Sequence, residues 1–93
     1  MRRIEWTTAF KRDFKREKKG KYRKTVAALV DGAVASLAED RPLAAAKSDH
    51  PLTGEWTDHR DCHLKPDLLL IYRKPDANTL TLARLGSHSE LFG

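Results

Sequence analysis

An apolar hairpin in the C-terminal half constrains the fold more than any other part of the chain. The run "DLLLIYRK" (67–74) is almost continuously apolar, which is typical of a central strand covered on both faces. The turn residues "PDAN" follow, and "TLTLARLG" (79–86) then predicts a neighbouring strand. In a chain of 93 residues, one layer of helices on one sheet is the natural limit for the core around such a hairpin.

The N-terminal half predicts that helical layer. "RRIEW" (2–6) is suited to a short strand, and Thr7 or Thr8 can then cap a helix that carries Phe10 and Phe14 on one face and ends at Gly20. A second helix is indicated by the clearest helical period in the chain, which closes before Pro42. Its apolar positions are Tyr22, Val26, Leu29, Val30, Ala33 and Leu37. We therefore expect a helical hairpin.

The segment "GEWTDHRDCHL" (54–64) predicts a further strand, because its polar and apolar residues alternate. The alternation assigns Trp56, Cys62 and Leu64 to the face toward the helices. The opposite face, expected to point outward, carries His59, Asp61, His63 and Lys65. The predicted order β-α-α-β-β-β is that of a single α+β domain over residues 1–93, with a small, mainly antiparallel sheet and the helical hairpin on one face.

The chain shows no apolar stretch suited to a signal peptide and none long enough to cross a bilayer, so we expect a cytoplasmic protein without membrane contact. The single cysteine, Cys62, excludes an intrachain disulfide and a multi-cysteine zinc site. Its place in a predicted strand indicates a small buried thiol.

The positive charge is concentrated at one end. Residues 1–24 hold eleven of the 18 Lys and Arg residues but only three of the 13 Asp and Glu residues, a net charge of +8, which leaves −3 for the rest. This basic end is a candidate surface for RNA or for an acidic protein partner, and a solvated lysine-rich helix has the same composition.

Histidines and carboxylates admit two chemical interpretations. His59, Asp61 and His63 have the alternate spacing of a metal-binding strand, although Lys65 beside them disfavours a dication. Alternatively, His50, His63 and His88 could converge with Asp61 and Asp67 for proton transfer, since histidine has an unperturbed pKa of about 6.5 and needs no metal for this task. The same histidines could also be solvated or structural.

Three sequence blocks resemble those of a known family. "DHPLTGEW" (49–56), "RDCHLKPDLLLIY" (60–72) and "RLGSHSELFG" (84–93) are similar to the blocks of the YafQ-like ribonuclease toxins of the RelE superfamily, in the same order and spacing. They cover about a third of the chain. The resemblance implies the RelE-like fold and a toxin of a type II toxin–antitoxin pair that cleaves mRNA in the ribosomal A site.

The resemblance also implies site residues. It carries over His50 from the first block, Asp61, His63 and Asp67 from the second, and His88 and Phe92 from the third. His50, Asp67 and His88 are then the candidate proton carriers, while His63 orients or shares the transfer and Asp61 fixes its tautomer. Arg84 is the candidate cation for the developing phosphate charge, and Phe92 either stacks on a base or caps the core. His59 has no counterpart in the family pattern and is interpreted as a surface residue.

The implied partners are the ribosome with its RNA, the mRNA substrate and a cognate antitoxin with an acidic or partly disordered segment; no cofactor is implied. The residues expected to contact RNA phosphates are Lys11, Arg12, Lys15, Arg16, Lys18, Lys19, Lys21, Arg23 and Lys24. Two alternatives stay open at this point: a basic module that binds RNA or a regulator without catalysis, and a small metal-dependent nuclease.

Overall fold

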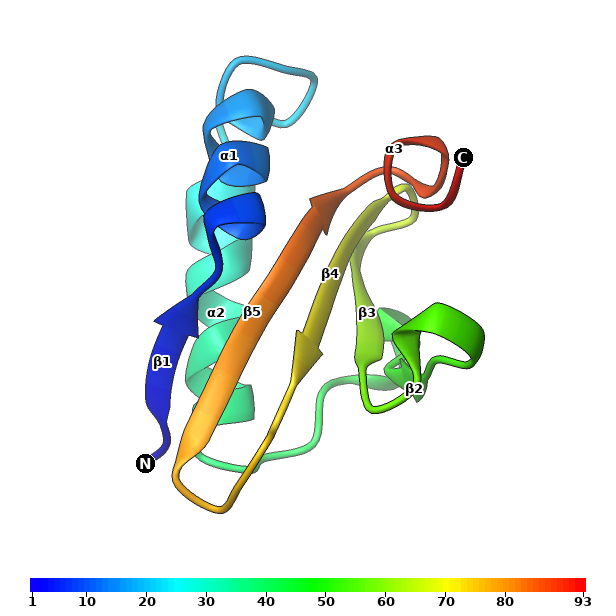
Figure 1. Ribbon diagram of the computed structural model, residues 1–93. Coiled ribbons are helices and arrows are strands. Elements are labelled where there is room, and N and C mark those ends of the chain that lie inside the picture. The colour runs from blue at the N-terminus through cyan, green and yellow to red at the C-terminus, as the bar shows by residue number, and fades with distance from the viewer.

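The computed structural model describes all 93 residues, which form a five-stranded sheet with helices packed against it (Figure 1). The strand order is β1-β5-β4-β3-β2; β1 pairs with β5 in parallel, and the other three pairings are antiparallel. The strands are β1 (Arg3–Trp6), β2 (His50–Pro51), β3 (Arg60–Lys65), β4 (Leu68–Arg73) and β5 (Thr79–Gly86). The helices are α1 (Thr8–Glu17), α2 (Val26–Ala38) and α3 (His88–Phe92), with the short 3₁₀ helices η1 (Ala45–Lys47) and η2 (Gly54–Trp56). The predicted α+β architecture is confirmed.

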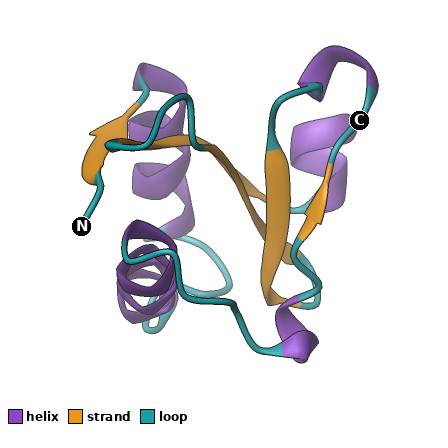
Figure 2. Cartoon of the chain, turned by 90° about the horizontal axis from the view of Figure 1, so that it is seen from below, coloured by secondary structure: helices purple, strands orange, loops and turns teal.

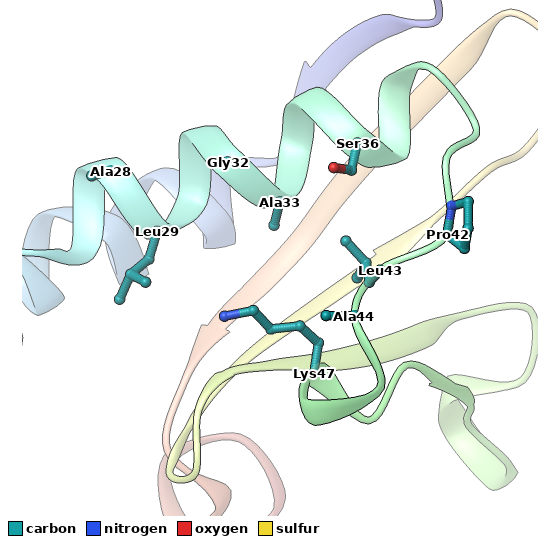
Figure 3. Close-up of a pocket in the computed structure, with 9 residues that line it drawn as sticks. All are labelled: Ala28, Leu29, Gly32, Ala33, Ser36, Pro42, Leu43, Ala44 and Lys47. Atoms are coloured by element: carbon teal, nitrogen blue, oxygen red, sulfur yellow. The ribbon is translucent and has the colours of Figure 1, made fainter.

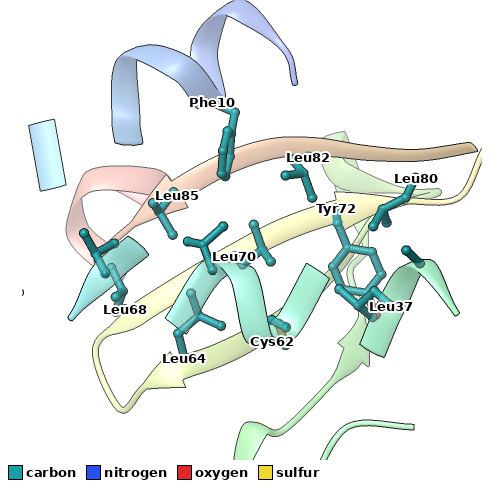
Figure 4. Packing of buried hydrophobic residues seen from close by; sticks show 14 residues of the cluster. Phe10, Leu37, Cys62, Leu64, Leu68, Leu70, Tyr72, Leu80, Leu82 and Leu85 are labelled. Atoms are coloured by element: carbon teal, nitrogen blue, oxygen red, sulfur yellow. The ribbon is translucent and has the colours of Figure 1, made fainter. Parts of the chain in front are cut away.

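The main core lies between the sheet and the helices α1 and α2 (Figure 4). α1 contributes Phe10 and α2 contributes Val26, Val30 and Leu37, all 3% exposed or less. The sheet contributes apolar residues of β3, β4 and β5, namely Cys62, Leu64, Leu68, Leu70, Tyr72, Leu80, Leu82 and Leu85. Cys62 is fully buried, as expected, and burial raises the pKa of its thiol to about 12.

The opposite face of the sheet has a smaller apolar cluster, which corrects one expectation. Leu69, Ile71, Ala83 and Leu91 form this cluster, and Trp56 packs against it. Trp56 therefore lies on the face opposite Cys62 and Leu64, because it belongs to the 3₁₀ helix η2 and not to the strand predicted from position 54. A 3₁₀ turn breaks the alternation of a strand, so the side predicted for Trp56 was wrong.

Several element boundaries also differ from those predicted. The first helix is capped by Thr7, whose Oγ1 accepts a hydrogen bond from the N–H of Phe10 at 3.0 Å, but it ends at Glu17 instead of Gly20. The second begins at Val26, and Tyr22 lies in the preceding turn. The two-residue strand β2 and the terminal helix α3 were not predicted. Figure 2 shows β1 and β2 at opposite edges of the sheet.

Side chains of α1 and of its N-cap residue, Thr7, complete the edge of β5 beyond the end of β1. Thr7 Oγ1 donates to the carbonyl of Ala83 at 2.9 Å, and the N–H of Leu85 donates to Asp13 Oδ2 at 3.0 Å. Arg16 Nη2 donates to the carbonyl of Leu85 at 2.9 Å. These bonds satisfy backbone groups that no strand pairs with, so α1 is joined to β5 by polar as well as apolar contacts.

The helical face also has a shallow cavity of about 250 Å³ between α2 and the segment from Pro42 to Lys47 (Figure 3). The cavity stays open because the residues of α2 that line it include Ala28, with a small side chain, and Gly32, with none. The longest helix, α2, has 13 residues, and no helix has the length and apolar character needed to span a membrane.

Candidate functional site

Three histidines and one phenylalanine form a continuous row of rings. The ring centroids of His50 and His63 are 6.3 Å apart, those of His63 and His88 are 6.0 Å apart, and those of His88 and Phe92 are 5.6 Å apart. The rings come from β2, β3 and α3, so segments distant in the sequence meet here. We call His50, His63, His88 and Phe92 the histidine row.

Asp61 lies under this row and is almost fully buried, at 2% exposure, instead of facing outward as predicted. Strand β2 pairs His50 with Asp61, which brings His50 Nε2 to 3.2 Å from Asp61 Oδ1. The contact does not have hydrogen-bond geometry, and Oδ1 accepts no other hydrogen bond within the chain. Burial raises the pKa of Asp61, while His50, His63 and His88 lower it, and burial is the larger effect.

Both ring nitrogens of His50 lie near an oxygen of the protein. His50 Nδ1 lies 2.7 Å from the carbonyl of Ser48, so Nδ1 carries a proton and donates it there. His50 Nε2 is therefore the ring nitrogen that faces the buried carboxylate of Asp61, beside His63.

Helix α3 carries His88 and Phe92, and a capping box fixes its start. Ser87 Oγ accepts from the N–H of Glu90 at 3.1 Å, and Glu90 Oε1 accepts from the N–H of Ser87 at 2.8 Å. Asp67, in the turn between β3 and β4, accepts a hydrogen bond from the N–H of His88 at 3.2 Å. Leu91 is buried and anchors the helix, whereas Phe92 is 41% exposed. The sequence signal for this helix was present, since Ser-x-x-Glu is a capping-box pattern.

The side chain of Arg84 forms an ion pair within the protein. Its Nε donates to Asp13 Oδ2 at 2.6 Å, and its Nη2 donates to Asp13 Oδ1 at 3.2 Å. Asp13 is fully buried; burial acts to raise its pKa, but hydrogen bonds from Arg84 and Leu85 and the charges of Arg84 and Arg16 outweigh burial, and its pKa is lowered. The carboxylate of Asp13 is therefore the charge that Arg84 neutralises in this structure.

The predicted RNA-contacting cations are all exposed. Four of them, Lys11, Lys15, Lys18 and Lys19, surround a hollow of about 380 Å³ together with Phe14. Arg16 differs from the other eight, because its guanidinium contacts several carboxylates. Lys11, Lys15, Lys18 and Lys19 therefore form a cluster of positive charge on α1 and the following turn.

His59 lies outside the histidine row. Strand β3 begins at Arg60, and the ring of His59 packs edge-on against Trp56 with centroids 5.1 Å apart. The expected alternation of His59, Asp61 and His63 is therefore not formed. No three His, Cys, Asp or Glu side chains of the chain are grouped so as to hold a metal ion.

Two lysines beside His63 were not selected from the sequence. Lys47 and Lys65 line a hollow of about 410 Å³ together with Ser48 and His63, and no carboxylate lines it. Lys47 precedes the first family block, and Lys65 was considered only as a hindrance to metal binding. Their proximity depends on how η1 packs beside β3, which no local pattern indicates.

The burial of Asp61 leads to a prediction about stability. Because its pKa is raised in the folded protein, the folded state loses stability as the pH rises from 3.8, the unfolded value, through the folded pKa. We expect Asp61→Asn to raise the Tm at pH 7 relative to the wild-type protein, with a smaller difference near pH 3. Calorimetry on Asp61→Asn and on the exposed control Asp31→Asn tests this; an unchanged or lower Tm at pH 7 for Asp61→Asn would contradict it.

The similarity to known proteins agrees with this geometry. A family model described as a bacterial toxin of type II toxin-antitoxin system, YafQ, matches residues 2–93. The mRNA interferase toxin YafQ of Escherichia coli K12 is 48% identical over 52 residues, which cover 56% of this chain and 55% of that protein. The chain thus spans about half the length of the curated relatives that it matches.

Solved structures match over the whole chain. A copper-bound mutant toxin from Helicobacter pylori has a TM-score of 0.89 at 35% identity, covering 99% of this chain and 100% of that one. The DinJ–YafQ complex of Escherichia coli contains a chain with a TM-score of 0.85 at 34% identity, covering 100% of both. The fold expected from the resemblance is therefore confirmed. The matched residues, the shared fold and the convergence of the three sequence blocks all agree, and the chain belongs to the YafQ family of bacterial toxins of type II toxin–antitoxin systems.

Proposed function

We propose that this protein is a toxin that cleaves mRNA as an endoribonuclease in the ribosomal A site, by acid–base catalysis without a metal, and so inhibits translation in the cytoplasm. The observation that carries the proposal is the convergence of His50, His63 and His88 with Asp67 at one surface, above the buried carboxylate of Asp61. The relative from Escherichia coli is named an mRNA interferase, which supports the same activity.

The reaction needs one group that removes a proton and one that supplies a proton. A base takes the proton of a 2′-hydroxyl, the 2′-oxygen attacks the adjacent phosphorus, and an acid protonates the leaving 5′-oxygen. His50, Asp67 and His88 are the proposed proton carriers. His63 contacts both neighbouring imidazole rings and orients or shares the transfer, and the carboxylate of Asp61 lies beside His50 at one end of the row.

Cations and an aromatic ring support substrate binding in this proposal. Lys47 and Lys65 in the hollow beside His63 offer positive charge to RNA phosphates. Arg84 stays a proposed stabiliser of the phosphate, although Asp13 already holds two of its nitrogens. The exposed ring of Phe92, tilted at 47° to His88, can stack on an unpaired base.

The proposed partners follow from charge. The lysine-rich face of α1 and the following turn can bind ribosomal RNA phosphates without reading sequence. The Escherichia coli relative forms a complex with DinJ, so we propose a cognate antitoxin for this chain, with an acidic or partly disordered segment that competes for the same charge.

Primer extension on a defined mRNA tests the function. We expect the wild-type protein to cut within codons in a reconstituted translation system, and to cut far less when ribosomes are omitted. RNA mixed with the protein and EDTA, in a ribosome-free reaction at high protein concentration, tests metal independence, since a chelator would also disrupt ribosomes. Translation arrest without cuts would contradict the enzyme and favour a module that binds the ribosome without catalysis.

A further inference from the structure

Arg16 is the one cation of the basic N-terminal region whose guanidinium nitrogens are all held by acceptors of the fold. Its Nη1 donates to Asp13 Oδ1 at 3.0 Å and its Nη2 donates to the carbonyl of Leu85 at 2.9 Å. Its Nε lies 3.0 Å from Glu17 Oε2 and also 3.0 Å from Glu90 Oε2. Three of the five N–H donors of this guanidinium, one on each nitrogen, are therefore used within the fold.

The contact with Glu90 connects Arg16 to the candidate active site. Glu90 uses one oxygen, Oε1, to accept the N–H of Ser87, and turns the other, Oε2, toward Arg16. Ser87 and Glu90 together form the capping box at the start of α3. His88 and Phe92 belong to α3, so the position of two members of the histidine row depends on Glu90.

Gly86 leaves the space through which Arg16 reaches α3. A Cβ atom on Gly86 would lie 2.8 Å from Arg16 Nη2, 3.1 Å from Glu90 Oε1 and 3.3 Å from Leu91 Cδ2. Any larger residue at position 86 therefore displaces the guanidinium or the glutamate. Gly86, Arg16 and Glu90 are therefore packed against one another at the start of α3. The lysines of α1, in contrast, are exposed to solvent.

We propose that Arg16 is a positioning residue: it holds Glu90, and through the Ser87–Glu90 capping box it sets the place of His88 and Phe92 against His63 and Asp67. Its task is therefore different from the phosphate binding expected for the neighbouring cations. The kinetic consequence rests on the proposed ribonuclease function, whereas the structural consequence for α3 does not.

A matched pair of variants separates positioning from phosphate binding. Arg16→Ala and Lys15→Ala remove one positive charge each from adjacent positions of α1, but Lys15 has no hydrogen bond or ion pair in the chain. Because a misplacement of about 1 Å at an active site can cost about 100-fold in rate, we expect Arg16→Ala to lower kcat by up to about 100-fold. Lys15→Ala should instead raise KM and reduce its dependence on salt concentration, with kcat within about twofold of the wild-type value.

NMR of the free protein tests the same proposal without any activity. We expect Arg16→Ala to shift the His88 imidazole resonances and to speed amide exchange in α3, whereas Lys15→Ala leaves both at their wild-type values. Arg16→Ala also removes a partner of the buried Asp13, so Glu90→Gln provides a milder variant. The amide oxygen of the glutamine can still accept the N–H of Ser87, but the negative charge that faces Arg16 is gone. It should shift His88 in the same way.

The outcomes are distinct. Unchanged His88 resonances and α3 exchange in both Arg16→Ala and Glu90→Gln would overturn the positioning role, as would kinetics of Arg16→Ala that match those of Lys15→Ala. If the wild-type protein cuts no RNA, the proposed function fails, and the NMR comparison still decides whether Arg16 holds α3.

Discussion

Alanine at His88 is expected to lower the rate constant for mRNA cleavage on saturating ribosomes by about 100- to 10,000-fold, because a general acid or base typically contributes that much to a reaction. The side chain of His88 is exposed and contacts His63 and Phe92, so its removal takes no residue from the core. Helix α3 should remain in place, since Leu91 anchors it and the capping box does not involve the imidazole. Single-turnover primer extension measures the rate.

His59→Ala is the matched control for this result. His59 is also a histidine near the site, but its ring packs against Trp56 and lies outside the histidine row. We expect His59→Ala to cut at a rate within about threefold of the wild-type protein, and both variants to unfold with Tm values close to that of the wild type. Equal rates for His88→Ala and wild type would remove His88 from the proposed mechanism.

The main sheet could be predicted from the sequence because its signals are local. β4 and β5 are apolar runs joined by turn residues, and the structure places them as neighbours in the centre of the sheet. Periodicity likewise identified the face of α2 that packs on the sheet, including Val26, Val30 and Leu37. In these elements the burial of apolar residues and the local period point to the same structure.

The site could be predicted only through the family resemblance. His50 reaches Asp61 because β2, a strand of two residues, pairs with β3, and a strand that short has no periodicity to detect. His88 is placed by a bond to Asp67 that joins residues 21 positions apart. Neither contact has a local signal, so residue patterns alone left the convergence of the histidines undecided.

The same limit applies to charge. The basic N-terminal region was identified correctly from the count of Lys and Arg, but the count treated Arg16 and Lys15 alike. What distinguishes them is a set of acceptors on β5 and α3, from Leu85 to Glu90, far away in the sequence. Charge patterns thus indicate where a charged surface lies, whereas tertiary contacts decide which of its cations are free to bind a partner.

Replacement of Asp13 is expected to cost more stability than any other change of a single charge in this protein. Asp13 is fully buried and accepts from Arg84, from Arg16 and from the N–H of Leu85. Asp13→Ala leaves the guanidinium of Arg84 and the N–H of Leu85 without their acceptor and takes one carboxylate from Arg16, and breaking a buried pair in this way costs about 3–5 kcal/mol. We expect the midpoint of urea unfolding at pH 7 to fall accordingly, whereas Asp31→Ala, an exposed aspartate on α2, should change the free energy of unfolding by no more than about 0.5 kcal/mol.

The pH dependence of unfolding gives the Asp13 prediction a second, independent measurement. The pKa of Asp13 is lowered in the folded state, so its contribution to stability is present above the unfolded pKa of 3.8 and is lost as the pH falls through the lower folded pKa. Asp13→Asn can still accept the N–H of Leu85 but has no charge for Arg84 and no proton to gain. The wild-type protein should therefore lose stability between pH 5 and acid conditions more steeply than Asp13→Asn, with the two curves approaching each other at the acid end. Parallel curves for the two proteins would show that the charge of Asp13 does not support the fold, and would restrict its role to the hydrogen bond that completes the edge of β5.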